Sequence, residues 1–265
     1  MRRSIAIVLT ILLSLSLFLT GCTHIAETPA KEFIVEKKTD VVAIKQYIGS
    51  SENVKVPSEI EGKPVTVIGP AAFVNMNIKT VILPDSVEMI RLGAFQNCEQ
   101  LSDVRFGENL KCIEHEAFQN CVSLKTIVFP ESLTEIQVFA FEGCTGLTDV
   151  QINSTDLVIG KSAFESNKSL TDLTLNGVKQ IGWGAFMWAS QLESVTIPET
   201  VETIKGSAFE YCPKLKDVFF EGDLPESIDA TTFSSGKGTI TLHYKKGAKG
   251  FDDPALSDYT LEEYE

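Results

Sequence analysis

Hydrophobic positions return along most of the chain with a period of about 23 residues. A phenylalanine, usually preceded by alanine, recurs at steps of 22 to 24 residues. Hydrophobic residues follow it at fixed offsets, most often three, six, nine and eleven positions later. A pattern that returns this often predicts stacked copies of one structural unit with a continuous core. The eight phenylalanines are Phe73, Phe95, Phe118, Phe141, Phe164, Phe186, Phe209 and Phe233.

Each repeat divides into two halves with different periodicities. The phenylalanine and the residues three and six positions later share one face of a helix, so this half predicts a short helical turn. The second half alternates hydrophobic and polar residues, as a strand requires, and a proline or glycine often ends it. Residues 152–160 (INSTDLVIG) and 175–182 (LNGVKQIG) lack that proline. There we expect wider turns without a change of fold.

The combined pattern AFxxCxxLxxVxFPxxLxxI resembles the BspA-like leucine-rich repeats of bacterial surface proteins, from roughly Val54 to Leu242. The resemblance implies an α/β solenoid with stacked parallel short strands on one, concave face and short helical turns on the other. We expect one solenoid domain over residues 33–265. Its terminal repeats are irregular, which predicts an N-terminal cap at about 33–68 and a C-terminal cap at about 239–265.

The first 22 residues form a separate segment. Arg2 and Arg3 precede a hydrophobic run from Ile5 to Leu19, which is shorter than the ~20 residues of a spanning helix. This layout predicts a secretory signal. The run ends in LTGC, which resembles the bacterial lipobox and implies a lipoprotein signal peptide at residues 1–21 with lipid on Cys22. The alternative is an ordinary signal peptide that ends near a cysteine.

The segment after the signal is short and polar. Residues 22–32 are expected to be the lipidated N-terminus and a tether to the solenoid. At ~3.3–3.6 Å per residue, the stretch from Thr23 to Lys31 reaches at most about 30 Å. The solenoid is therefore expected to stay close to a lipid surface.

The remaining cysteines are expected to be free. Four of them stand three residues after a phenylalanine, where Met76, Asn167 and Ala189 also occur, which indicates a small buried side chain. Stacked coils at about 5 Å would permit a disulfide within this column. Three cysteines in a row cannot all pair, however, so we favour buried thiols. The four are Cys98, Cys121, Cys144 and Cys212.

Signals for catalysis are weak. His24, His115 and His243 share no spacing, and SSGK at 234–237 lies in a glycine-rich turn without partner motifs. No cysteine and histidine spacing fits a zinc site, so no metal or other cofactor is expected. The formal charge of −13 becomes −15 once the two arginines of the signal segment are removed, which argues against nucleic acid as a partner. The chain is not expected to be an enzyme.

Two surfaces compete as the binding site. The first is the strand face, where residues on either side of the buried valine position point outward and form an extended surface. The second is the helical side, where Trp188 and Tyr211 occupy one column on adjacent coils and could stack on a sugar or a partner side chain. Alternatively, these two aromatics cover each other and Met187. The strand-face candidates are Asp103, Arg105, Asp149, Asp172, Ser194, Thr196, Asp217 and Phe219.

Binding is the expected function. We expect a monomeric, lipid-anchored extracytoplasmic protein that binds a protein or glycan, for adhesion or for interaction with host or envelope proteins. The alternative is a carbohydrate-binding or envelope-scaffolding protein. In either case the lipid on Cys22 holds it to the cell membrane or the outer membrane, facing the extracellular or periplasmic side. The acidic pair Asp149 and Asp172 is predicted to face each other across one step of the sheet.

Overall fold

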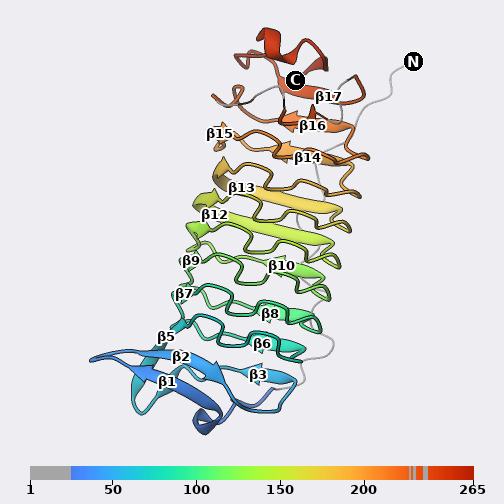
Figure 1. The fold of residues 1–265 in the computed structure, drawn as a ribbon. Coiled ribbons are helices and arrows are strands. Elements are labelled where there is room, and N and C mark those ends of the chain that lie inside the picture. The colour runs from blue at the N-terminus through green and yellow to red at the C-terminus, as the bar shows by residue number, and fades with distance from the viewer. Residues whose placement is uncertain (1–24, 227, 229–230, 235–237) are drawn as a thin grey trace.

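The computed structural model describes residues 25–226, 228, 231–234 and 238–265, so the predicted signal segment and Cys22 lie outside it. The described chain forms a solenoid of short strands stacked coil upon coil (Figure 1). No described residue is in an α-helix. The 3-10 segments η1 (Ala30–Glu32) and η3 (Pro254–Leu256) lie near its two ends. The stack of parallel strands is confirmed, but the expected α/β class is wrong, because the fold is a β-solenoid.

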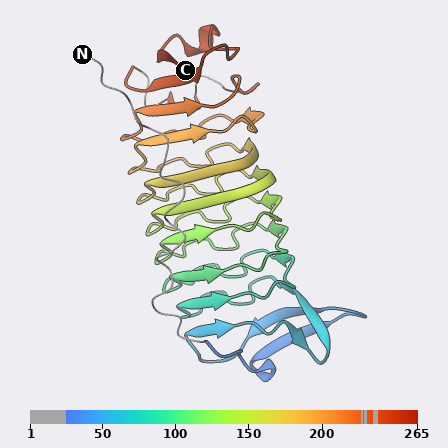
Figure 2. The same cartoon turned by 180° about the vertical axis from the view of Figure 1, so that it is seen from behind.

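Two ladders of parallel strands run along the solenoid, and both views show them side by side (Figures 1 and 2). The concave curvature expected for the strand face stays a prediction. The first ladder contains β3 (Asn53–Lys55), β6 (Thr80–Ile82), β8 (Asp103–Arg105), β10 (Thr126–Val128), β14 (Ser194–Ile197), β16 (Asp217–Phe220), β17 (Thr241–Lys245) and β18 (Thr260–Tyr264). The second contains β5 (Lys63–Ile68), β7 (Met89–Ile90), β9 (Cys112–Ile113), β11 (Glu135–Ile136) and β15 (Thr203–Ile204).

Two longer strands, β12 (Asp149–Ile159) and β13 (Asp172–Ile181), belong to both ladders. They contain the two segments that lack proline. The prediction of wider turns in these segments is therefore wrong, because the strands are continuous there. Proline cannot donate a ladder hydrogen bond, and without it the strand continues through the corner. A register shift beside Leu157 absorbs the extra residue that β12 carries, as a bulge does.

The turns around the repeating phenylalanines from Phe73 to Phe209 are not helical, contrary to the prediction from spacing. Around Phe118, φ is 57° at Glu116 and 60° at Asn120, and left-handed residues interrupt a helix. The N–H of Cys121 donates to the Phe118 carbonyl at 3.2 Å, which closes a tight turn. The Phe118 N–H donates to the Ala140 carbonyl of the next coil at 2.7 Å. Consecutive tight turns bury every third residue as a helix does, so spacing alone could not distinguish them.

The eight phenylalanines form one stack of rings through the core. Successive centroids lie 4.7 to 5.5 Å apart, and the interplanar angles do not exceed 17°. Tyr47 extends the stack, because its ring lies 5.4 Å from that of Phe73 at 25°. Tyr47 could not be predicted from the repeat, since its spacing to Phe73 is 26 residues and no alanine precedes the tyrosine.

The cysteine column consists of buried, free thiols, as expected. Each thiol donates to the phenylalanine carbonyl of the preceding coil, with Sγ–O distances of 3.0 to 3.4 Å. Burial raises the pKa of Cys98, Cys144 and Cys212 to about 12, so the thiols stay protonated and remain donors. Asn167 stands in the same column. It is fully buried, and among the described residues neither atom of its amide has a hydrogen-bond partner.

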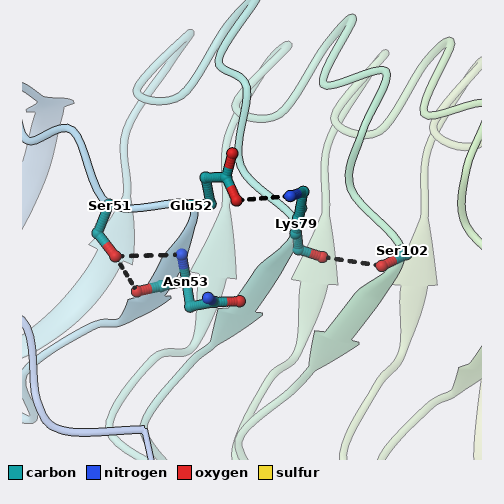
Figure 3. Close-up of polar contacts among 5 residues, drawn as sticks. All are labelled: Ser51, Glu52, Asn53, Lys79 and Ser102. Atoms are coloured by element: carbon teal, nitrogen blue, oxygen red, sulfur yellow. Dashed lines mark hydrogen bonds and ion pairs between the residues drawn. The ribbon is translucent and has the colours of Figure 1, made fainter.

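A polar row marks the start of the first ladder (Figure 3). The Lys79 carbonyl accepts hydrogen bonds from the Ser102 N–H at 2.9 Å and the Ser102 hydroxyl at 3.2 Å. Lys79 Nζ pairs with Glu52 Oε2 at 2.6 Å, and Ser51 Oγ donates to the Asn53 carbonyl at 2.8 Å (Figure 3). In later coils the hydroxyls of Thr148 and Thr171 repeat the Ser102 bond. These contacts fix where the strand face begins.

The two ends differ from the regular coils. At the N-terminal end, β1 (Phe33–Lys37) pairs antiparallel with β2 (Val42–Tyr47), and β4 (Glu59–Ile60) pairs antiparallel with β5. At the C-terminal end, β18 continues the first ladder in parallel with β17. This strand, which lies within the expected C-terminal cap at about 239–265, was not predicted from the sequence. That these ends act as caps stays a prediction.

Candidate functional site

The strand-face candidates occupy outward positions of the first ladder. In β8, Asp103 and Arg105 flank the inward Val104, because successive side chains of a strand point to opposite faces. Arg105 Nη2 lies 3.2 Å from Asp103 Oδ2, with 59% and 43% of the two side chains exposed. Exposed ion pairs contribute ~0–1 kcal/mol, so a partner can exchange this contact for its own at small cost.

Asp149 and Asp172 are directly opposite each other in the parallel pairing of β12 and β13, as predicted. Burial raises the pKa of Asp149, and the charge of Asp172 raises it further. A hydrogen bond from Gln151 Nε2 to Asp149 Oδ2 at 2.7 Å opposes this shift in pKa. The pair is therefore a point of accumulated negative charge that a cationic partner would relieve.

Four further candidates come together on β14 and β16. Ser194 is opposite Asp217, and Thr196 is opposite Phe219. Both β14 side chains are exposed, whereas Asp217 and Phe219 are half-buried because β17 covers their other side. This end of the face combines hydroxyl, carboxylate and aromatic groups.

His243 completes this C-terminal cluster, although it was not among the site residues predicted from the sequence. Its ring stacks on Phe219, with centroids 4.4 Å apart and planes at 11°. Its Nε2 lies 2.8 Å from Asp217 Oδ1, and its Nδ1 lies 3.5 Å from Glu262 Oε2. His243 directly follows the buried Leu242, as Phe219 directly follows the buried Val218, and the two are in register. This equivalence could have indicated His243 from the sequence. Within the described chain, no group of three or more His, Cys, Asp or Glu residues could hold a metal ion.

The strand face is not one unbroken hydrogen-bonded sheet. β3, β6 and β8 form one sheet, and β14, β16, β17 and β18 form another. β10, β12 and β13 belong to a third sheet, which continues into the second ladder. The eight candidates thus fall into three groups, around Asp103, around Asp149 and around Asp217.

Trp188 and Tyr211 lie together on the turn side, the face of the solenoid formed by the tight turns around the phenylalanines. Their rings stack 4.2 Å apart at 14°, as the alternative interpretation expected, yet 42% and 44% of the two residues stay exposed. Both have a left-handed backbone, with φ of 66° and 56°. Such a conformation costs an L residue roughly 1–2 kcal/mol, and other coils place asparagine, glycine or serine there. Because this backbone conformation is rare for aromatic residues, the pair is a candidate functional site.

The segment before the solenoid packs against it from Thr28 onward. The Thr28 N–H donates to the Lys55 carbonyl at 2.9 Å, the Lys55 N–H donates to Thr28 Oγ1 at 3.1 Å, and Thr28 is 6% exposed. The predicted lipid site Cys22 lies outside the described residues. Among the residues that are described, no helix is long and apolar enough to cross a membrane.

Comparisons with known proteins agree with this architecture. A family model described as the BspA type leucine rich repeat region matches in six copies, over residues 66–177, 111–241 and 157–264. No curated protein matches the chain.

Solved structures of bacterial leucine-rich repeat proteins are similar to the chain. One from Bacteroides ovatus is 19% identical over 90% of this chain and 67% of its own, with a TM-score of 0.64, and shows the same fold. A leucine-rich repeat protein of T. pallidum is 27% identical over 89% and 82%, with a TM-score of 0.48. One from Bacteroides capillosus is 35% identical over 40% of this chain and 83% of its own, with a TM-score of 0.38.

Proposed function

Since the chain belongs to the BspA-type leucine-rich repeat family of bacterial surface-type proteins, we propose that it is a lipid-anchored extracytoplasmic protein that binds macromolecular partners. The role is binding rather than catalysis. The partner is a protein of the host or of the cell envelope, which makes the chain an adhesion or interaction module. The protein faces the extracellular or periplasmic side of the cell membrane or the outer membrane.

The observation that carries this proposal is the length of the outward strand face. Ten described strands line it from β3 to β18, so at ~4.8 Å per step it is about 43 Å long. A face of this length matches protein interfaces, which bury ~800 Å² per partner, better than a small substrate. The acidic pair and the C-terminal cluster give the face a charge pattern that favours a basic partner.

The anchor is proposed from the lipobox resemblance at Cys22 and from the packing of Thr28. At ~3.3–3.6 Å per residue, the six steps from Cys22 to Thr28 reach at most about 20 Å, which holds the N-terminal coils near the bilayer. Each buried CH₂ of an acyl chain contributes ~0.8 kcal/mol, so several chains give durable anchoring. Cys22→Ala should move the protein from the detergent phase to the aqueous phase and abolish lipid labelling. Unchanged partitioning would contradict the anchor.

The partner class is tested with purified extracellular-matrix proteins and a glycan array in parallel. The proposal expects saturable binding to a matrix protein that weakens with salt. The double variant Asp149→Asn with Asp172→Asn should weaken this binding and its salt dependence while leaving folding intact. If binding were lost in the double variant Trp188→Ala with Tyr211→Ala but not in the aspartate double variant, the binding site would be on the turn side instead.

The second candidate is the carbohydrate-binding or envelope-scaffolding role, and the exposed aromatic pair is the observation that favours it. Binding on the glycan array without binding to any matrix protein would favour this candidate over a protein partner.

A further inference from the structure

The hairpin of β1 and β2 lies at the N-terminal end of the solenoid (Figures 1 and 2). In this hairpin Phe33 and Tyr47 are directly opposite each other, and both are buried. Their ring centroids lie 5.4 Å apart, and the Tyr47 ring stacks on Phe73. One side of the hairpin is therefore fixed to the end of the phenylalanine stack, and its other side faces away from the core.

The side of the hairpin that faces away from the core carries two isoleucines. Ile34 directly follows the buried Phe33, and Ile48 directly follows the buried Tyr47. Because successive side chains of a strand alternate between faces, both isoleucines point outward. Ile34 is in register with Gln46, two residues before Ile48, so the two are near neighbours on this side. The exposed fraction is 46% for Ile34 and 53% for Ile48, so the hairpin presents a hydrophobic surface.

The charge of the hairpin differs from that of the rest of the chain. Residues 30–48 contain four lysines and three acidic residues, which gives a net charge of +1. Without the signal arginines the whole chain carries −15, so the part outside the hairpin carries −16. Among the described residues, Lys31, Lys38 and Lys45 take part in no ion pair, and all three are exposed. The hairpin thus combines hydrophobic side chains with exposed ammonium groups on an otherwise acidic protein.

The proposed lipid is attached close to this end of the solenoid. Thr28 is hydrogen-bonded to Lys55 of β3, the first strand of its ladder. From Cys22 to Thr28 the chain reaches at most about 20 Å at ~3.3–3.6 Å per residue. The strand face is about 43 Å long at ~4.8 Å per step, so the tether is much shorter than the solenoid. A lipid on Cys22 therefore keeps the N-terminal end, and not the C-terminal end, at the bilayer.

Charge and hydrophobic burial both favour an upright solenoid. A bilayer with anionic lipids has a negative surface potential, which attracts lysines and repels carboxylates within a Debye length of ~8–10 Å. A solenoid lying on its side would bring its acidic coils within this distance. A solenoid standing on the hairpin keeps most of them farther away. It also removes the exposed isoleucines from water, as the hydrophobic face of an interfacial element does.

We propose that the outward side of the β1–β2 hairpin rests on the phospholipid bilayer, with Ile34 and Ile48 among the headgroups and the lysines beside anionic lipid. The inference rests on the proposed lipid anchor and goes beyond it, because it names the surface of the fold that contacts the lipid. The solenoid then stands on the bilayer, and the strand face is open to a partner along its length.

Tryptophan quenching by brominated phospholipids tests this contact. The lipidated full chain is placed in vesicles of phosphatidylethanolamine and phosphatidylglycerol, with both native tryptophans removed by Trp183→Phe and Trp188→Phe. Ile48→Trp puts a reporter on the hairpin, and Val128→Trp puts a matched one on the strand face, since 53% and 52% of these residues are exposed. Brominated acyl chains should quench Ile48→Trp at least twofold more than Val128→Trp.

A second substitution tests the hydrophobic contact itself. In the chain with Ile48→Trp, Ile34→Glu puts a carboxylate beside the reporter and should reduce its quenching at least twofold. Val122→Glu changes another exposed hydrophobic residue, outside the hairpin, and should have no effect. Equal quenching of the two reporters, stronger quenching of Val128→Trp, or quenching of neither would overturn the contact.

Flotation of the same vesicles separates this inference from the anchor. A chain that floats with the vesicles but shows no quenching of Ile48→Trp retains the anchor and refutes the contact. A chain that does not float refutes the anchor and the contact together.

Discussion

Truncating Phe118 to alanine removes a ring from the middle of the phenylalanine stack. Phe118 is fully buried between Phe95 and Phe141, with ring centroids 4.9 and 5.0 Å away, and Phe106 contacts its edge at 5.9 Å. The coils are held in step by hydrogen bonds on both sides of this position, so the surrounding chain cannot collapse easily into the space.

The expected loss of stability follows from these contacts. Removing a buried phenylalanine costs about 3–5 kcal/mol, and each aromatic neighbour contributes ~0.5–1.5 kcal/mol of that beyond burial. With three ring contacts, Phe118→Ala should fall near the upper end, at about 5 kcal/mol. Phe233 has one stacked partner, Phe209 at 5.5 Å, and an edge contact with Tyr259 at 6.2 Å. Phe233→Ala should therefore cost about 3 kcal/mol.

Urea unfolding measures this difference. Tryptophan fluorescence reports on the coil that carries Trp183 and Trp188, while far-ultraviolet circular dichroism reports on the whole ladder. The two probes also show whether the solenoid still unfolds as one unit, which a repeat protein need not do. Glu131→Ala, an exposed change on a neighbouring turn, is the control and should stay within about 0.5 kcal/mol. A Phe118→Ala cost no larger than that of Phe233→Ala would refute the reasoning from ring contacts.

Three further changes test other parts of the fold. The folded-state pKa of Asp149 is raised above its ordinary value of 3.8, so the protein loses stability as the pH rises from that ordinary value through the raised one. Asp149→Asn with Asp172→Asn should therefore add a few tenths of a kcal/mol to the free energy of unfolding at pH 7. This gain should vanish below about pH 4 in pH-dependent melts. Asn167→Cys restores the thiol of its column and removes two unsatisfied amide atoms, so it should raise stability by about 1–3 kcal/mol in urea, and a loss would contradict the column assignment. Gly177→Ala places a side chain at φ of 73° and against the Ser154 carbonyl, so the melting temperature should fall by several degrees; an unchanged value would show that β12 and β13 separate easily there.

The sequence by itself determined the repeat, the core columns and the outward positions of the strand face. A hydrophobic side chain that recurs every 22 to 24 residues is expected to be buried in each coil. Phe118 and its equivalents therefore lie in the core, although the backbone around them is a tight turn and not a helix. The 23-residue repeat likewise placed Asp149 opposite Asp172, and the two-residue period of a strand put both on the outward face. The free thiols followed from a column that also accepts methionine, asparagine and alanine.

Tertiary structure decided the features that depend on contacts between coils. The turns around Phe73 to Phe209, which contain residues with a left-handed backbone, are stabilised by bonds such as Phe118 N–H to the Ala140 carbonyl, which joins residues 22 positions apart. Tyr47 and His243 acquire their roles from the neighbouring coils, because Phe73 and Phe219 supply the rings on which they stack. β12 and β13 continue through a corner where the sequence lacks proline, and they pair with each other there across a register shift that depends on both coils. A local sequence pattern contains side-chain preferences, but hydrogen bonds between coils form only once the chain is stacked, and they set the backbone at the turns.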